Sequence, residues 1–158
     1  MRLKKASTSG AEEIIKEFFN KSSAELSEVI PKWALGNHLD KLLDYQLHPN
    51  RGKYSIFFVE VKQLIQISNF GEVILDKLFT DAQLNDIRIS RILSRWRDGL
   101  FIDPPTIYID SSKKKLNFSD GRHRTKAAHF LGNKLIPIAI EKCEVNEIGL
   151  LISLNKSI

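Results

Sequence analysis

The sequence predicts an α+β protein in which helices pack on a small mixed sheet. Runs rich in β-branched and aromatic residues, typical of strands, occur at residues 54–61, 106–109, 115–118 and 135–140. Stretches with helical spacing of apolar residues, bounded by capping residues and glycines, lie before and between these runs. A chain of 158 residues accommodates one compact domain. We expect a helical extension over residues 1–53 and the sheet-bearing domain over 54–158.

Short helices are expected in the extension, at residues 9–20, 22–30 and 38–47. Ser22 and Glu25 have the spacing of a capping box, in which each side chain bonds a free backbone amide of the first turn. The turn residues that follow, up to residue 53, separate these helices from the first strand. No internal repeat is present.

Thr80 and Gln83 form another predicted capping box, ahead of a helix that runs to Asp98 and ends at Gly99. The helical wheel gives this helix a packing face and, about 120° away, a solvated basic face. The packing face consists of Ile89, Ile92, Leu93 and Trp96, and the basic face of Arg88, Arg91 and Arg95.

The second half of the chain predicts a hairpin, a tight turn, a helix and a buried strand. Residues 106–109 and 115–118 are expected to pair across the turn residues between them. Residues 120–124 then form the turn, and a helix follows to Leu131 and stops at Gly132. The apolar run 135–140 is typical of a buried strand.

The turn before this helix breaks a local rule. A helix N-terminus carries partial positive charge and unpaired amides, so cations are disfavoured there. Arg122, His123 and Arg124 nevertheless crowd this end. They are favourable if an anion binds, because amides and guanidinium groups then converge on its oxygens, with Gly121 allowing a close approach. The alternative is that Asp120 simply caps the helix while the arginines point into solvent.

The spaced elements around this turn resemble the ParB/sulfiredoxin superfamily, specifically the ParB N-terminal domain. They are Asp98-Gly99, the Asp103-Pro104-Pro105 strand entry, the hairpin, Asp120 to Arg124, Ala127-Ala128, Leu131-Gly132 and Ile136-Pro137-Ile138. The likeness covers about residues 86–140. It implies a ParB/sulfiredoxin-like fold and a nucleotide ligand, ATP or CTP. It also assigns phosphate binding to Gly121, Arg122, His123, Arg124 and Thr125.

The same resemblance offers candidate catalytic residues. A sulfiredoxin would need a cysteine where Arg122 stands, so sulfinic-acid repair is not expected. The related free-serine kinases use an acidic base and a magnesium nucleotide, which suggests Asp120 and, more remotely, Glu60 on the first strand. His123 could transfer a proton, or act as a neutral hydrogen-bond donor, which we favour. Arg124→Ala is expected to abolish nucleotide binding and leave the fold intact.

Basic residues suggest a second ligand. The arginines of residues 88–95, with Arg97 and Lys113, Lys114 and Lys115 in the hairpin turn, could follow a nucleic-acid backbone, although a solvated helix face is the alternative. The leading expectation is an ATPase or CTPase that acts on or with DNA, such as a ParB-like nuclease of a plasmid, phage or mobile element. A small-molecule phosphotransferase and a non-catalytic, nucleotide-switched binding module are the alternatives.

Composition limits the remaining classes. The formal charge of +5 favours polyanionic partners, and 42% hydrophobic residues are ordinary for a globular protein. No signal-peptide or membrane-length apolar run appears, so we expect a cytoplasmic, bacterial protein without a membrane partner. The single cysteine, Cys143, excludes an internal disulfide and is expected to be a small buried residue.

Overall fold

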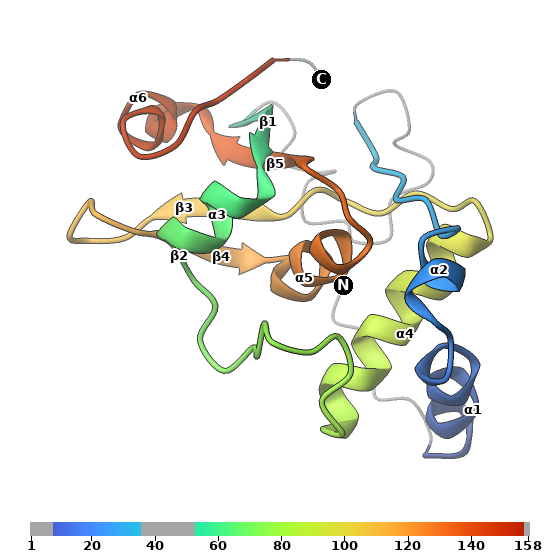
Figure 1. The fold of residues 1–158 in the computed structure, drawn as a ribbon. Coiled ribbons are helices and arrows are strands. Elements are labelled where there is room, and N and C mark those ends of the chain that lie inside the picture. Colours follow the sequence, from blue (N-terminus) through green and yellow to red (C-terminus); the bar gives the residue numbers. More distant parts are fainter. Residues whose placement is uncertain (1–7, 36–52, 157–158) are drawn as a thin grey trace.

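A computed structural model describes residues 8–35 and 53–156, and its centre is a five-stranded mixed sheet (Figure 1). The strands lie in the order β1, β5, β3, β4, β2. Their bounds are Tyr54–Glu60 for β1, Leu135–Glu141 for β5, Thr106–Ile109 for β3, Leu116–Asp120 for β4 and Ser68–Asn69 for β2. The α+β class and its four expected strands are confirmed.

Both strand directions occur within the sheet. β1 pairs with β5 antiparallel, and β5 pairs with β3 parallel. β3 and β4 form the expected antiparallel hairpin, and β2 adds to β4 in parallel. The two-residue strand β2 is too short to show a period-two pattern, which is why the sequence did not predict it.

Strand β5 is buried on both faces, and its isoleucines join the main core. Side chains alternate along a strand, so Ile136, Ile138 and Ile140 of β5 share one face. All three are fully buried and cluster with residues of helices α3, α5 and α6, namely Leu64, Ala127, Ala128 and Ile148. These helices span Val61–Ile67, Arg122–Phe130 and Val145–Gly149. Figure 1 shows α3 crossing in front of the sheet.

The predicted N-terminal helical layer packs against the long helix α4, Gln83–Arg97, and not against the sheet (Figure 1). It consists of α1, Thr8–Phe19, and α2, Ser23–Leu26. Trp96 of α4 is almost fully buried, and its Nε1 donates to Lys32 O at 3.0 Å. Extension and sheet-bearing part therefore share one core, which also includes Phe18.

Helix caps only partly follow the predictions. The Ser22–Glu25 box is present, with Glu25 N donating to Ser22 Oγ at 3.2 Å and Ser22 N to Glu25 Oε1 at 3.3 Å. Its helix ends at Leu26 and not near residue 30. The expected helix at residues 38–47 lies outside the described residues.

The predicted Thr80–Gln83 capping box is wrong. α4 begins at Gln83 with Ala82 at the N-cap and no side-chain cap. The side chain of Asp86 accepts from Thr80 N at 2.9 Å, so the preceding loop is held by a buried residue one turn into the helix. At the other end Gly99 has φ +76°, confirming the left-handed stop.

The segments after β1 and β5 differ from expectation. Val61 was placed in the first strand but begins α3, whose buried Val61 and Leu64 are three residues apart. Cys143 lies in the 3₁₀ turn η3, Lys142–Glu144, and is exposed, so its predicted burial is wrong. Its Sγ lies 3.6 Å from Glu141 Oε2.

Candidate anion site at the N-terminus of α5

The turn between β4 and α5 is built on Gly121, which has φ +104°. A Cβ added there would lie 2.6 Å from Pro105 Cα. The glycine is therefore required because the turn packs tightly on Pro105, in a backbone conformation that L side chains rarely adopt. This differs from the reason expected from sequence, which was the approach of a ligand.

The N-terminus of α5 has no side-chain cap, since the N-cap residue is Gly121 itself. The first intrahelical bond runs from Thr125 N to Gly121 O at 3.0 Å, so the amides before it point out of the helix end. Asp120 is the last residue of β4 and its Oδ2 accepts from Arg124 Nη2 at 2.9 Å. The alternative in which Asp120 caps the helix and the arginines point into solvent therefore does not hold for Arg124, which pairs with Asp120.

Arg124 and Thr125 are structural residues. Arg124 is only 8% exposed; besides its ion pair with Asp120, its Nη1 donates to Asp103 O at 3.4 Å. Thr125 is fully buried, and its hydroxyl donates to Gly121 O at 3.0 Å. The structure corrects the role of Thr125 as a phosphate ligand, because its hydroxyl is inside the protein. Arg124 is nearly buried in an ion pair, so its removal is expected to lower stability as well.

Arg122 is held by a loop that the sequence did not connect with the site. Its Nη1 donates to Phe70 O at 3.1 Å. The next residue is Gly71, and a Cβ there would lie only 2.6 Å from the same nitrogen, so Arg122 packs closely on this turn. The Phe70 ring packs on Phe118 of β4, with centroids 4.9 Å apart. The Asn69-Phe70-Gly71 turn residues were the only signal in the sequence that could have located this loop.

His123 is held in its neutral form. Burial, then the charges of Arg88, Lys126 and Arg122, lower the pKa of His123 to about 4. At neutral pH its imidazole is uncharged and has one N–H donor and one acceptor nitrogen. The favoured role of His123 as a neutral hydrogen-bonding group agrees with this environment.

A buried lysine completes the cluster of positive charge. Lys126 is fully buried, its Nζ donates to Asn85 Oδ1 at 2.9 Å, and burial lowers its pKa while nearby Asp86 raises it. Asn85 and Asp86 belong to the first turn of α4, so this contact ties the N-terminal turns of α4 and α5 together. A lysine in a polar helix segment is expected at the surface, so the burial of Lys126 was not predicted from the sequence.

The two predicted carboxylates are not brought together. Glu60 is exposed at the end of β1, opposite Leu135 of β5, whereas Asp120 lies in β4. Three strand spacings separate β1 from β4, which is roughly 14 Å across the sheet. Glu60 is therefore not part of this site.

The basic residues proposed for nucleic acid also separate. The charge of Arg88 acts on His123 and lowers its pKa. Arg95, in contrast, donates to Phe101 O at 3.1 Å and burial lowers its pKa, so its assignment to a solvated face is wrong. The hairpin turn with Lys113, Lys114 and Lys115 projects on the opposite side of the molecule from α4 (Figure 1). Lys113 Nζ also pairs with Glu147 at 3.1 Å. These described basic residues therefore do not form one continuous surface.

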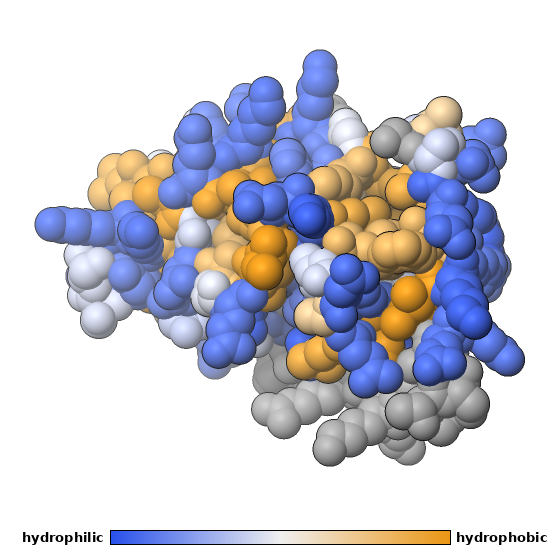
Figure 2. Space-filling view, turned by 60° about the horizontal axis from the view of Figure 1, so that its bottom comes forward, coloured by the Kyte–Doolittle hydropathy of each residue, from blue (hydrophilic) through white to orange (hydrophobic). Residues whose placement is uncertain are grey.

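Figure 2 shows a face on which hydrophilic side chains surround an apolar area. Within the described residues, the one group of side chains whose donor atoms are close enough to hold a metal is Glu141, Cys143 and Glu144. These residues lie at the end of β5 and in η3, and Lys53 Nζ already pairs with Glu141 at 3.2 Å. They take no part in the α5 site.

Comparison with known proteins gives no relative: no family model, no curated protein and no solved structure matches the chain. Among the described residues no helix is long and apolar enough to span a membrane.

Proposed function

We propose that this chain binds the phosphates of a nucleotide, ATP or CTP, at the N-terminus of α5, and that it is a phosphohydrolase working on or with DNA. The observation that carries the proposal is the uncapped positive end of α5, with Arg122 and Arg88 beside a neutral His123. We call this group of three side chains and the helix N-terminus the α5 site.

Electrostatics favour an anion in the α5 site. The charges of three cations act on the imidazole of His123, which burial keeps neutral, and the helix dipole adds partial positive charge. A phosphate would accept from the outward amides and from Arg122, whose guanidinium has five N–H donors, of which the Phe70 carbonyl accepts one. Arg124 contributes by fixing Asp120 and the turn.

The choice of a nucleotide as ligand and of a hydrolase as activity rests on the resemblance to the ParB/sulfiredoxin superfamily. This resemblance supports a nucleotide as ligand and a ParB-like nuclease or NTPase of a plasmid, phage or mobile element, in the cytoplasm of a bacterium. Contact with DNA is supported by the charge of +5 and by Arg88 and Arg91 on α4. The hairpin lysines lie on the opposite side of the molecule from α4, so they would not contribute to the same DNA contact.

A second candidate is a non-catalytic module that nucleotide binding switches. It is favoured by the positions of the predicted catalytic groups: Glu60 is three strands from Asp120, and Asp120 is in an ion pair with Arg124. The phosphotransferase alternative needs an available acidic base, so the same geometry weighs against it. Mg²⁺ would arrive with the nucleotide phosphates, and the predicted carboxylate pair does not form a site for it.

Isothermal titration with ATP, CTP and GTP, with and without Mg²⁺, tests the binding. Arg122→Gln should weaken affinity about ten-fold or more, because a charge-assisted contact is worth about 1.5–3 kcal/mol. Lys114→Gln, the same charge change in the remote hairpin, should leave affinity unchanged. Equal affinities of the two variants would refute the α5 site. Phosphate release by the wild type then distinguishes a hydrolase from a binding module.

A further inference from the structure

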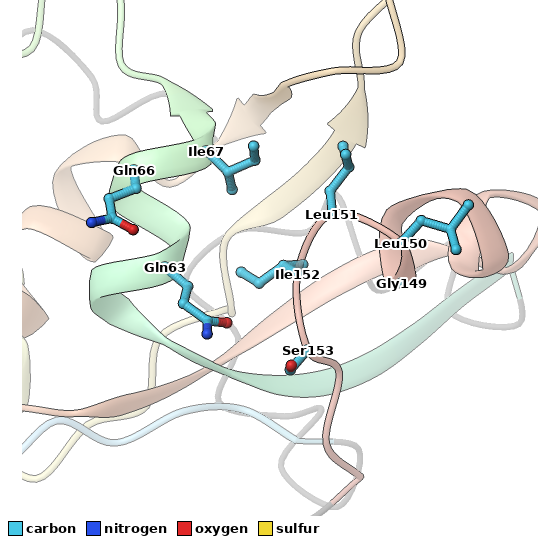
Figure 3. Close-up of a pocket in the computed structure, with 8 residues that line it drawn as sticks. All are labelled: Gln63, Gln66, Ile67, Gly149, Leu150, Leu151, Ile152 and Ser153. Carbon is cyan, nitrogen blue, oxygen red and sulfur yellow. The ribbon is translucent and has the colours of Figure 1, made fainter.

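The turn at Phe70 and Gly71 is supported by the strand that leads into the α5 site. Strand β2 follows α3 directly, and Ile67, the last residue of α3, lines a hollow between α3 and residues 149–153 (Figure 3). β2 pairs with β4 in parallel. The chain turns just after β2, whereas β4 continues to Asp120 and the start of α5. The turn and the start of α5 are therefore both fixed to β4.

Contacts within the turn give the Phe70 carbonyl a defined position. Val73 N donates to Phe70 O at 3.0 Å, and Gly71 N donates to the side chain of Asn69 at 2.9 Å. The Phe70 ring is buried against β4. The same Phe70 oxygen accepts from Arg122 Nη1 at 3.1 Å. The guanidinium of Arg122 is thus anchored to a backbone atom that is itself held in place.

Gly71 leaves the space that this guanidinium occupies. It has φ +57°, and a Cβ at this position would lie 2.6 Å from Arg122 Nη1 and 3.9 Å from its Cζ. A separation of 2.6 Å is well below van der Waals contact. The obstructed atom is at the end of a flexible side chain, so the guanidinium would move before the backbone does.

We propose that Gly71 is a positioning residue of the α5 site: because it has no side chain, Arg122 can dock on the Phe70 carbonyl and is held there to bind phosphate. The proposal rests on the proposed function, since Arg122 must be a phosphate ligand for its position to matter. A guanidinium that is anchored before the ligand arrives loses less freedom on binding, and this preorganisation favours affinity. A methyl group at residue 71 would remove the anchor.

Isothermal titration with ATP or CTP, whichever the wild type binds, measures the effect. Gly71→Ala should weaken affinity about three- to ten-fold, and no more than Arg122→Gln does. In the Arg122→Gln background the same change should alter affinity less than about two-fold, because the side chain through which it acts is gone. The loss of thermal stability from the positive φ should remain in that background. A purely structural role of Gly71 would not give this pattern in affinity.

Gly132→Ala is the matched control. Gly132 lies at the other end of α5 with φ +83°, and an added Cβ would meet nothing within 4 Å, so affinity should change less than about two-fold. Gly71→Asn is a second variant, because asparagine tolerates positive φ better than alanine and still carries a Cβ. It should weaken affinity as much as Gly71→Ala.

The outcomes separate this proposal from the proposed function. Unchanged or tighter binding in Gly71→Ala, or an equal loss with and without Arg122, would overturn the positioning role while leaving the nucleotide site. A wild type that binds neither nucleotide would overturn both.

If both Gly71 variants fail to fold, NMR on the wild type decides. Nucleotide should shift the Gly71 amide together with the Arg122 Nε–H, because Phe70 O and Gly71 N belong to one planar peptide unit. A shift at Arg122 without one at Gly71 would overturn the positioning role.

Discussion

Gly121→Ala should destabilise the protein more than any other glycine-to-alanine change at a helix end. The residue has φ +104°, and the new Cβ would lie 2.6 Å from Pro105 Cα and 2.7 Å from its Cβ. Both contacts are with a rigid ring and its backbone, so neither can be relieved by rotating a side chain. The turn, Pro105 or α5 must move.

Gly132→Ala is the matched control. Gly132 ends the same helix with φ +83°, but a Cβ there would meet nothing within 4 Å. In both variants the positive φ costs about 1–2 kcal/mol, offset by about 0.4–1 kcal/mol from the stiffer unfolded chain. Only Gly121→Ala adds overpacking, about 1–3 kcal/mol. The difference between the two variants should therefore be about 1–3 kcal/mol, or roughly 2–12 °C in Tm.

Thermal and urea unfolding of the two variants and the wild type measure this difference. Gly121→Ala should have the lower midpoint in both experiments, with the urea m-value unchanged. Two variants with the same midpoint would show that Pro105 does not confine the turn. The geometry deduced for the α5 N-terminus would then be wrong.

Four further predictions concern individual side chains. Arg124→Ala should lower stability by about 1.5–3 kcal/mol, because it removes a nearly buried charge-assisted contact; an unchanged Tm would contradict its structural role. The pKa of His123 is lowered to about 4 in the folded protein, so between pH about 6.5 and about 4 only the unfolded chain takes up a proton at this residue. The free energy of unfolding should therefore fall by up to about 3 kcal/mol as the pH drops through this range. Urea titrations should show that His123→Gln loses this part of the pH dependence. Cys143→Ser should change stability by less than about 0.5 kcal/mol, since the thiol is exposed, and chemical denaturation checks it. Replacing Arg88 and Arg91 together by Gln should reduce the salt dependence of duplex-DNA binding by up to about 1.8 in log–log slope, measured by fluorescence anisotropy; an unchanged slope would refute DNA contact by α4.

The fold was predictable where local patterns were long and repeated. The buried face of α4, the hairpin and the run that became β5 each extend over enough residues for their periodicity to be unambiguous. Short elements were not predicted, because they contain too few residues for a periodic pattern. α3 has seven residues and β2 has two, so neither shows a full pattern.

The candidate site was only partly predictable. The unusual crowding of cations at one helix start was visible in the sequence, because it breaks the rule for the helix dipole. The sequence did not indicate which of these side chains points away from the protein. Arg124 and Thr125 follow Arg122 by two and three positions, yet both are held inside by Asp120, Asp103 and Gly121.

The sequence by itself determined the class of the fold, the position of the turn at Gly121 and the concentration of charge beside it, because these depend on neighbours along the chain. Only the tertiary structure decided which groups meet. It brings Lys126 to Asn85 and Arg122 to Phe70, and it keeps Glu60 three strands from Asp120. Such contacts depend on strand order and helix packing, which join residues far apart in the chain and leave no local pattern in it.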